Sequence, residues 1–181
     1  MLLKGNNVRL RALEPEDLEI FADVENDPAL WACSSTNVPY SRFAVRCFIS
    51  STANDIYADK QVRLVACGNS DGVPMAFADI TNFEPRHRRA EVGIVVFPGY
   101  RNRGIGAEVL GLLGEYARKV VALHTLYAVV AESNEASRRL FAKAGYEKAA
   151  LLPQWLFVDG KYEDALIFEK IMAGEVWRKK P

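Results

Sequence analysis

The feature that most constrains this chain is a succession of strand, turn, long helix and strand between Ala90 and Ala131. Residues 90–97 and 126–131 predict the strands, and residues 104–121 predict the helix. Apolar side chains recur along that helix at helical spacing, on a face wide enough to cover a sheet: Ile105, Val109, Leu110, Leu112, Leu113, Tyr116 and Ala117. Because residues 126–131 are apolar without alternation, we expect this strand to be buried on both faces and paired in parallel with its predecessor. The chain should therefore contain a βαβ unit.

Further elements are predicted on both sides of this unit. They are strands at 8–13, 61–66 and 73–83, helices at 16–26, 41–53 and 134–144, and strands within 146–172 that are broken at 158–161. The helix at 41–53 should direct Phe43, Cys47 and Phe48 inward. We expect one α/β (α+β) domain over residues 1–181, with a tail from about residue 173. Its mixed, mostly antiparallel sheet of about six to seven strands should be flanked by about four helices.

The charge balance and the cysteines exclude several classes of protein. With 23 basic and 23 acidic residues, the chain has no overall charge that would attract nucleic acid or an anionic membrane. No segment approaches the roughly 20 apolar residues of a membrane-spanning helix, and the first residues lack the apolar core of a signal peptide. We therefore expect a cytoplasmic protein. Cys33, Cys47 and Cys67 are odd in number and widely spaced, which favours reduced core thiols. The two histidines lie far from these cysteines and from each other, so we expect no metal site.

The turn that opens the long helix suits an anion. Residues 98–106 read Pro-Gly-Tyr-Arg-Asn-Arg-Gly-Ile-Gly, in which arginines accompany a Gly-x-Gly pair. The first amides of a helix have no acceptor within it, the helix dipole adds partial positive charge, and glycine allows a phosphate to approach closely. The turn is neither a P-loop nor a dinucleotide-binding fingerprint, whose third glycine is replaced here by Val109. The alternative is that Gly104 and Gly106 only permit tight packing where the helix begins.

Motifs in a fixed order accompany this turn. They are Val-Arg-Leu-Arg-Ala-Leu-Glu-Pro-Glu-Asp at 8–17, His-Arg-Arg-Ala-Glu at 87–91, the turn itself, Asn-Glu-Ala-Ser at 134–137, Ala-Gly-Tyr at 144–146 and Asp-Gly-Lys-Tyr-Glu-Asp at 159–164. In these segments the chain resembles the GNAT N-acetyltransferases, and more closely the branch that contains ribosomal-protein alanine N-acetyltransferases and bacterial spermidine N-acetyltransferases. The resemblance spans nearly all of residues 8–172. It implies a sheet that splays open between the strands at 90–97 and 126–131, with acetyl-CoA wedged into the gap.

The resemblance also implies which residues bind the cofactor. The backbone of Ile94, Val95 and Val96 would pair with the pantetheine arm, and the amide of Val95 or Val96 would stabilise the oxyanion. The amides that would hold the pyrophosphate belong to Arg101, Asn102, Arg103, Gly104, Ile105 and Gly106. Asn134 matches the asparagine that contacts the pantetheine side of CoA, and Ser137 and Phe141 follow it on the same helix.

Acetyl transfer to an amine needs a base that takes a proton from the ammonium. The candidates are carboxylates on or beside the strands that flank the family's cleft: Glu91 first, then Glu84, then Asp79. The alternative for each is an ordinary solvated side chain. His87, in a basic segment, is a weaker candidate. Trp155, Phe157 and Tyr162 either line the amine pocket or only pack the last strands, and we favour the second reading.

The departing thiolate also needs a proton, and here the chain departs from the family. Many relatives have a tyrosine in the position of Phe141, and phenylalanine cannot donate a proton. Ser137, one turn away on the same helix face, is the preferred replacement, and Tyr146 is the alternative to it, although a core aromatic with a solvated hydroxyl explains Tyr146 more simply. Helix capping also explains Asn134 and Ser137 without any catalytic role.

The sequence thus predicts an N-acetyltransferase that transfers the acetyl group of acetyl-CoA to a primary amine by direct attack in a ternary complex. The amine would be a protein N-terminal amine, a polyamine or a small-molecule amine. The alternative is a catalytically silent acetyl-CoA-binding sensor or regulatory module, for which Phe141 is the motive. A purely partner-binding domain would leave the turn at 101–106 unexplained. The resemblance is compatible with a homodimer.

Overall fold

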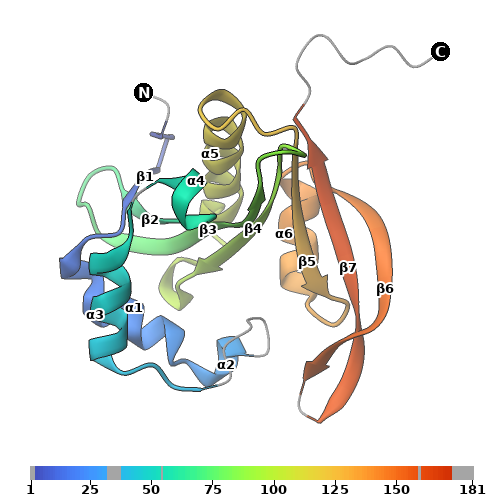
Figure 1. Ribbon diagram of the computed structural model, residues 1–181, viewed down its shortest axis with the longest axis horizontal. Helices are drawn as coiled ribbons and strands as arrows, with labels where there is room; N and C mark the ends of the chain where they lie inside the picture. The colour runs from blue at the N-terminus through green and yellow to red at the C-terminus, as the bar shows by residue number, and fades with distance from the viewer. Residues whose placement is uncertain (1–2, 32–37, 54, 159, 173–181) are drawn as a thin grey trace.

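The computed structural model describes residues 3–31, 38–53, 55–158 and 160–172. A seven-stranded sheet in the order β1-β2-β3-β4-β5-β7-β6 forms its centre (Figure 1). The strands are β1 (Val8–Ala12), β2 (Val62–Gly68), β3 (Pro74–Glu84), β4 (Arg89–Val96), β5 (Thr125–Ala131), β6 (Glu147–Val158) and β7 (Lys161–Ile171). Only β4 and β5 are parallel neighbours. The prediction of a mixed, mostly antiparallel sheet with one parallel βαβ unit is confirmed.

Four helices of eight or more residues flank the sheet, as predicted. They are α1 (Leu18–Glu25), α3 (Arg42–Ser51), α5 (Ile105–Lys119) and α6 (Glu135–Lys143); the short helices α2 (Pro28–Trp31) and α4 (Ile56–Asp59) and the 3-10 turns η1 (Pro15–Asp17) and η2 (Pro98–Tyr100) were not predicted. The helix expected at 16–26 is divided, because the Asp17 carboxylate accepts the Glu14 amide at 2.9 Å and closes a separate first turn. None of the described helices is long and apolar enough to cross a membrane.

The two faces of the sheet pack against different helices. On one face, α5 buries Val109, Leu110 and Leu113 against strand residues such as Ile80 and Val92. On the other face, α1 and α3 cover a cluster in which Phe21, Phe77 and Phe97 make edge contacts at 5.2–5.5 Å. The predicted face of the long helix is confirmed, with its centre at Leu110 and Leu113. The first cluster continues over β5 and β7, whereas the second lies over β2 to β4, so only that half of the sheet is covered on both sides.

The expected inward orientation in α3 is wrong for Phe43 and Cys47 and is confirmed for Phe48. Phe43 is 73% exposed and Cys47 is exposed, whereas Val45 is buried and Phe48 is half-buried. The inward stripe runs from Val45 to Phe48 and Ile49, which is the i, i+3, i+4 spacing of one helix face, and Phe43 lies outside it. The expectation of core thiols holds for the buried Cys67 and fails for Cys47. Cys33 and the tail from residue 173 lie outside the described residues.

We expect β5 to be buried on both faces, but the structure buries only one of them. Leu126, Ala128 and Val130 are buried, while Thr125, Tyr127 and Val129 are half-buried. The reason is that β5 pairs with β4 over only three residue pairs, the last of which joins Glu91 to Tyr127. Beyond that pair the strands separate, as Figure 1 shows. One face of β5 therefore borders a gap in the sheet, and the splay that the resemblance implied is present.

Candidate active site

The gap leaves part of the backbone of a central strand without a neighbouring strand. The Phe97 amide donates to the Met75 carbonyl at 2.9 Å, on the β3 side of the sheet. Because successive backbone groups of a strand point to opposite edges, the amide of Val95 also points toward β3, while those of Ile94 and Val96 point into the gap. Gly93 to Val96 are accordingly half-buried, although they lie in the middle of the sheet. Of the two amides considered for the oxyanion, only that of Val96 is directed into the gap.

The turn after β4 presents its amides in the way that an anion requires. The first helical hydrogen bond of α5 runs from the Glu108 amide to the Gly104 carbonyl at 3.2 Å, so the amides of residues 105–107 have no acceptor within the helix. Gly104 has φ +80°, a conformation that favours glycine, and a side chain there would meet no atom within 4 Å. The backbone at Gly104 is therefore open to a ligand.

The two glycines of this turn serve different purposes. A Cβ atom at Gly106 would lie 3.1 Å from Leu140 and 3.3 Å from Val96, so the packing explanation applies to Gly106. It does not apply to Gly104. Of the two arginines, Arg101 donates from Nε to the Val96 carbonyl at 3.0 Å, at the edge of the gap. The Arg103 guanidinium lies 5.8 Å from the centre of the Tyr100 ring. Both remain exposed, and they place positive charge beside the open amides.

A row of polar side chains crosses the sheet at the point where the gap begins. Thr81, Glu91, Tyr127 and Glu169 are successive partners across β3, β4, β5 and β7, so their side chains share the face that carries α1. The Asn82 amide donates to the Glu91 carboxylate at 2.7 Å. Partial burial, followed by the negative charge of Glu91, raises the pKa of Tyr127 above its usual value, so its hydroxyl stays protonated near neutral pH. Glu91 thus lies at the closed end of the gap, in a fixed orientation.

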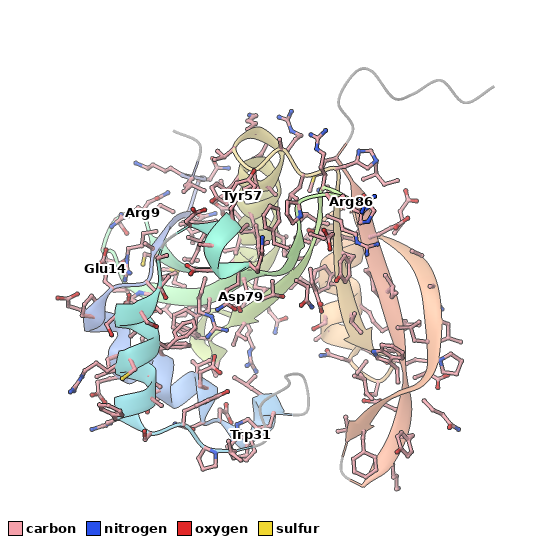
Figure 2. All side chains as sticks on the ribbon, in the orientation of Figure 1. Arg9, Glu14, Trp31, Tyr57, Asp79 and Arg86 are labelled. Atoms are coloured by element: carbon pink, nitrogen blue, oxygen red, sulfur yellow. The ribbon has the colours of Figure 1, made fainter. Side chains whose placement is uncertain are left out.

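The other two carboxylate candidates are placed less favourably. Asp79, labelled in Figure 2, accepts two hydrogen bonds from Arg63, at 2.6 and 3.0 Å, and Arg63 also pairs with Glu25 of α1. Burial opposes the charge of Arg63, but Asp79 and then Glu25 raise its pKa, so the guanidinium remains cationic. Glu84 lies opposite Arg89, farther from the gap than Glu91. The structure therefore leaves Glu91 as the candidate beside the gap that is not ion-paired with an arginine.

We expect Arg63→Met to lower the free energy of unfolding by about 3 kcal/mol, the lower end for a buried pair, because it leaves the half-buried Asp79 and Glu25 together without a cation. Urea unfolding followed by circular dichroism measures this loss. Arg42→Met is the matched control, since it breaks the exposed 2.6 Å pair with Glu19 and should cost about 1 kcal/mol or less. A loss no larger than that of the control would show that the Arg63 network does not anchor α1.

The start of α6 shows the capping that the sequence allowed. Asn134 Oδ1 accepts the Ser137 amide at 3.0 Å, as an N-cap does. Phe141 is buried against Phe168 and Tyr146, at ring distances of 6.3 and 5.2 Å. The expectation of a solvated Tyr146 hydroxyl is wrong: the residue is 3% exposed, and its hydroxyl has no hydrogen-bond partner among the described residues. Burial raises the pKa of Tyr146 far above its usual value.

Several other predicted features lie away from this site. His87 is exposed in the turn between β3 and β4. Trp155, Phe157 and Tyr162 are between 62% and 67% exposed on β6 and β7. Phe157 and Tyr162 pair across these strands with ring centres 5.1 Å apart, as the favoured reading predicted. A cavity of about 250 Å³ lies between η1, α1 and α3, and none of the predicted site residues lines it. Over the ranges that the structure describes, no group of three His, Cys, Asp or Glu side chains could hold a metal ion.

Comparison with known proteins identifies the family. The acetyltransferase (GNAT) domain matches residues 7–147. Spermidine N(1)-acetyltransferase of Escherichia coli is 27% identical over 169 residues, which are 90% of this chain and 84% of that protein. An uncharacterized N-acetyltransferase of Bacillus subtilis is 32% identical over 90 residues, 50% of this chain and 51% of that protein. Spermidine N-acetyltransferase of Vibrio cholerae, solved in complex with CoA and spermine, has a TM-score of 0.80 at 21% identity and covers 91% of this chain and 95% of its own.

The chain belongs to the GNAT acetyltransferase family. Its reaction is the transfer of an acetyl group from acetyl-CoA to an amine. The open amides at Gly104 and the unpaired edge of β4 are the features that suit acetyl-CoA. Three polar residues near the gap, Asn82, Arg63 and Tyr127, were not predicted from the sequence. Tyr127 was hidden by the apolar run around it, and only the strand register places it beside Glu91.

Proposed function

We propose that the amine is a cationic polyamine, which is acetylated on the α1 face of the sheet beside Glu91. The observation that carries this proposal is the polar row, which continues from Glu91 through Tyr127 to Glu169 and Glu147 on the same face. Glu147 and Glu169 lie directly opposite each other, an arrangement that costs stability unless a cation is near. Arg89 is the one positive residue that shares this face on β4. The names of the spermidine acetyltransferase relatives agree with this charge pattern.

The roles of the individual residues follow as part of the same proposal. The amides of residues 101–106 hold the pyrophosphate, and the edge of β4 from Ile94 to Val96 pairs with the pantetheine arm. Glu91 accepts the proton that the ammonium loses, the amine nitrogen bonds to the acetyl carbon, and the Val96 amide stabilises the oxyanion. The carbon–sulfur bond then breaks, the nitrogen loses its second proton, and the thiolate takes a proton. Ser137 passes that proton to the thiolate and is reprotonated by the proton that leaves the nitrogen, a role that the buried Phe141 cannot fill.

The proposed function is tested in two steps. Calorimetry should show binding of acetyl-CoA, and an assay of released CoA thiol should then show turnover with spermidine and spermine. A peptide with an amino-terminal alanine should react far more slowly, because it carries one ammonium where the polyamines carry several. Faster turnover of the peptide would refute the polyamine and leave the acetyl transfer intact.

A second candidate function rests on the buried Phe141, which occupies the position of the usual proton donor. A sensor that has lost turnover would bind acetyl-CoA and release no CoA with any amine. The same two measurements distinguish this function from the enzyme, because they separate binding from turnover.

We expect Ser137→Ala to lower kcat by about 100-fold while the affinity for acetyl-CoA is retained, because this is the lower end of what a proton donor typically contributes. Single-turnover measurement of CoA release at saturating acetyl-CoA gives the value. Ser133→Ala is the matched control, since Ser133 is exposed just before the helix. An unchanged kcat in Ser137→Ala would assign the proton to water.

We also propose that the chain forms one acetyltransferase domain, acts in the cytoplasm, where thiols such as Cys67 stay reduced, and assembles as a homodimer. The edge strand β6 supports the dimer, because Trp155 and Phe157 are exposed near this edge and apolar patches of this kind favour association. Sedimentation of the purified chain at the mass of a monomer would contradict the dimer.

A further inference from the structure

Gly93 has no side chain, and this leaves an open space on the face of the sheet where β4 and β5 have just separated. Glu91 is the last residue of β4 that pairs with β5. Gly93 lies two positions farther along β4, so the two residues belong to the same face. Of the residues that the structure describes, only Asp79 would come within 4 Å of a Cβ atom built at Gly93, with its side chain at 3.7 Å. Because β5 no longer pairs with β4 at this level, none of the described side chains of β5 lies beside Gly93.

Charged side chains border this space on two sides. Asp79 is the partner of Gly93 on β3, and Arg63 is the partner of Asp79 on β2, so Asp79 lies between a guanidinium and the open space. The Asp79 side chain is 15% exposed, and its Oδ2 atom lies 3.7 Å from the position that a Cβ atom at Gly93 would take. Along β4, Glu91 is one step of about 7 Å away on the same face. An ammonium over Gly93 would therefore lie beside the Asp79 carboxylate of β3 and next to the Glu91 carboxylate of β4.

The charges of these groups leave an excess of negative charge at the space. Glu25 and Asp79 share the single cation Arg63, so this network carries one negative charge, and Glu91 adds a second. The Arg63 side chain is fixed by the Phe21 ring at 4.7 Å as well as by its two carboxylates, so it cannot move toward Gly93 without breaking them. Arg89 shares this face but lies two positions before Glu91, on the side away from Gly93, so a substrate ammonium over Gly93 would offset the negative charge there.

We infer that the reactive nitrogen of the substrate binds over Gly93, between Asp79 and Glu91, and that the absence of a side chain at position 93 determines whether the amine can reach the acetyl group. This inference rests on the proposed function, since it places the amine of that reaction. Asp79 binds the ammonium while its own charge is shared with Arg63, and Glu91 then takes the proton. The neutral amine then moves about 10 Å along β4, toward the Val96 amide that would receive the acetyl oxygen.

The test compares Gly93→Ala and Gly93→Val with the parent chain. Alanine fits at the ordinary contact distance of 3.7 Å, and both residues favour strands more than glycine does, so the variants should fold. We expect Gly93→Ala to raise the KM for the amine about tenfold and Gly93→Val to abolish turnover, because one added carbon in a fitted site changes discrimination by that order. The Kd for acetyl-CoA, measured by calorimetry, should stay at the parent value. Gly111→Ala, on the exposed side of α5, is the control and should change neither constant.

The outcomes separate this inference from the function on which it rests. An unchanged amine KM in both Gly93 variants overturns it, and so does an equal loss of acetyl-CoA affinity, which would place the cofactor over Gly93 instead. If polyamines are not turned over but another amine is, the choice of polyamine fails, and the same comparison with that amine decides the role of Gly93. If no amine is turned over by the parent chain, the enzyme and the inference fail together.

Discussion

Gly104→Asp should abolish acetyl-CoA binding while leaving the fold intact. Aspartate is among the residues that tolerate a positive φ, and no atom lies within 4 Å of the position, so the substitution causes little strain. Its charge, however, would lie beside the amides that receive the pyrophosphate. Two like charges about 4 Å apart near a protein surface repel by about 4 kcal/mol, which corresponds to a Kd about 1000-fold weaker.

The matched control for this change is Gly104→Asn, which has nearly the same shape and no charge. Calorimetry should show that it binds acetyl-CoA within about tenfold of the parent chain, because the cost of a positive φ for asparagine is of the order of 1 kcal/mol. Thermal unfolding of both variants should be similar. Affinity equal to that of the parent chain in both variants would mean that the phosphates bind elsewhere. The same large loss in both variants would mean that shape, and not charge, closes the site.

Glu91→Gln should lower kcat/KM for the amine by about 100- to 10,000-fold at neutral pH, the usual contribution of a general base. Glutamine keeps the size of the side chain and can still bond to Asn82, so the sheet should be undisturbed. The loss of kcat/KM should shrink as the pH rises, since alkylammonium groups have a pKa of about 10 and the neutral amine needs no base. Initial rates of CoA release between pH 7 and pH 10 measure both effects.

Glu84→Gln serves as the control for the same chemical change. Glu84 lies opposite Arg89 and farther from the gap, so its replacement should alter kcat/KM only a few-fold. A larger defect in Glu84→Gln than in Glu91→Gln would transfer the role of base to Glu84. A Glu91→Gln defect that stays constant up to pH 10 would show that Glu91 orients the substrate and does not remove its proton.

Local patterns predicted most of the fold, and long-range pairing decided what they missed. The helix at 104–121 and the hairpin of β2 and β3 were predictable, because periodicity and turn residues act within a few positions. The inward face of α3 was not, since Phe43 and Val45 are both apolar and only the position of the sheet selects between them. Propensity alone cannot make that choice.

The candidate site shows the same division. The turn at Gly104 carries its chemistry in consecutive residues, so the sequence was enough to find it. The group around Glu91 draws Asn82 from β3 and Tyr127 from β5, and the network beside Gly93 draws Arg63 from β2. Contacts of this kind depend on strand register, which a single sequence does not specify. The weakness of Asp79 as a base was hidden for the same reason, because its partner Arg63 precedes it by 16 positions.

The separation of β4 from β5 also bears on how the protein unfolds. The strands on either side share only three residue pairs, so the backbone of the sheet is continuous at one end and interrupted at the other. A ligand whose amides pair with β4 acts as a missing strand, and its binding energy is added to the free energy of unfolding. At a concentration 100 times its Kd, acetyl-CoA would contribute about 2.7 kcal/mol. The resistance of this protein to heat is therefore expected to follow the supply of its own co-substrate.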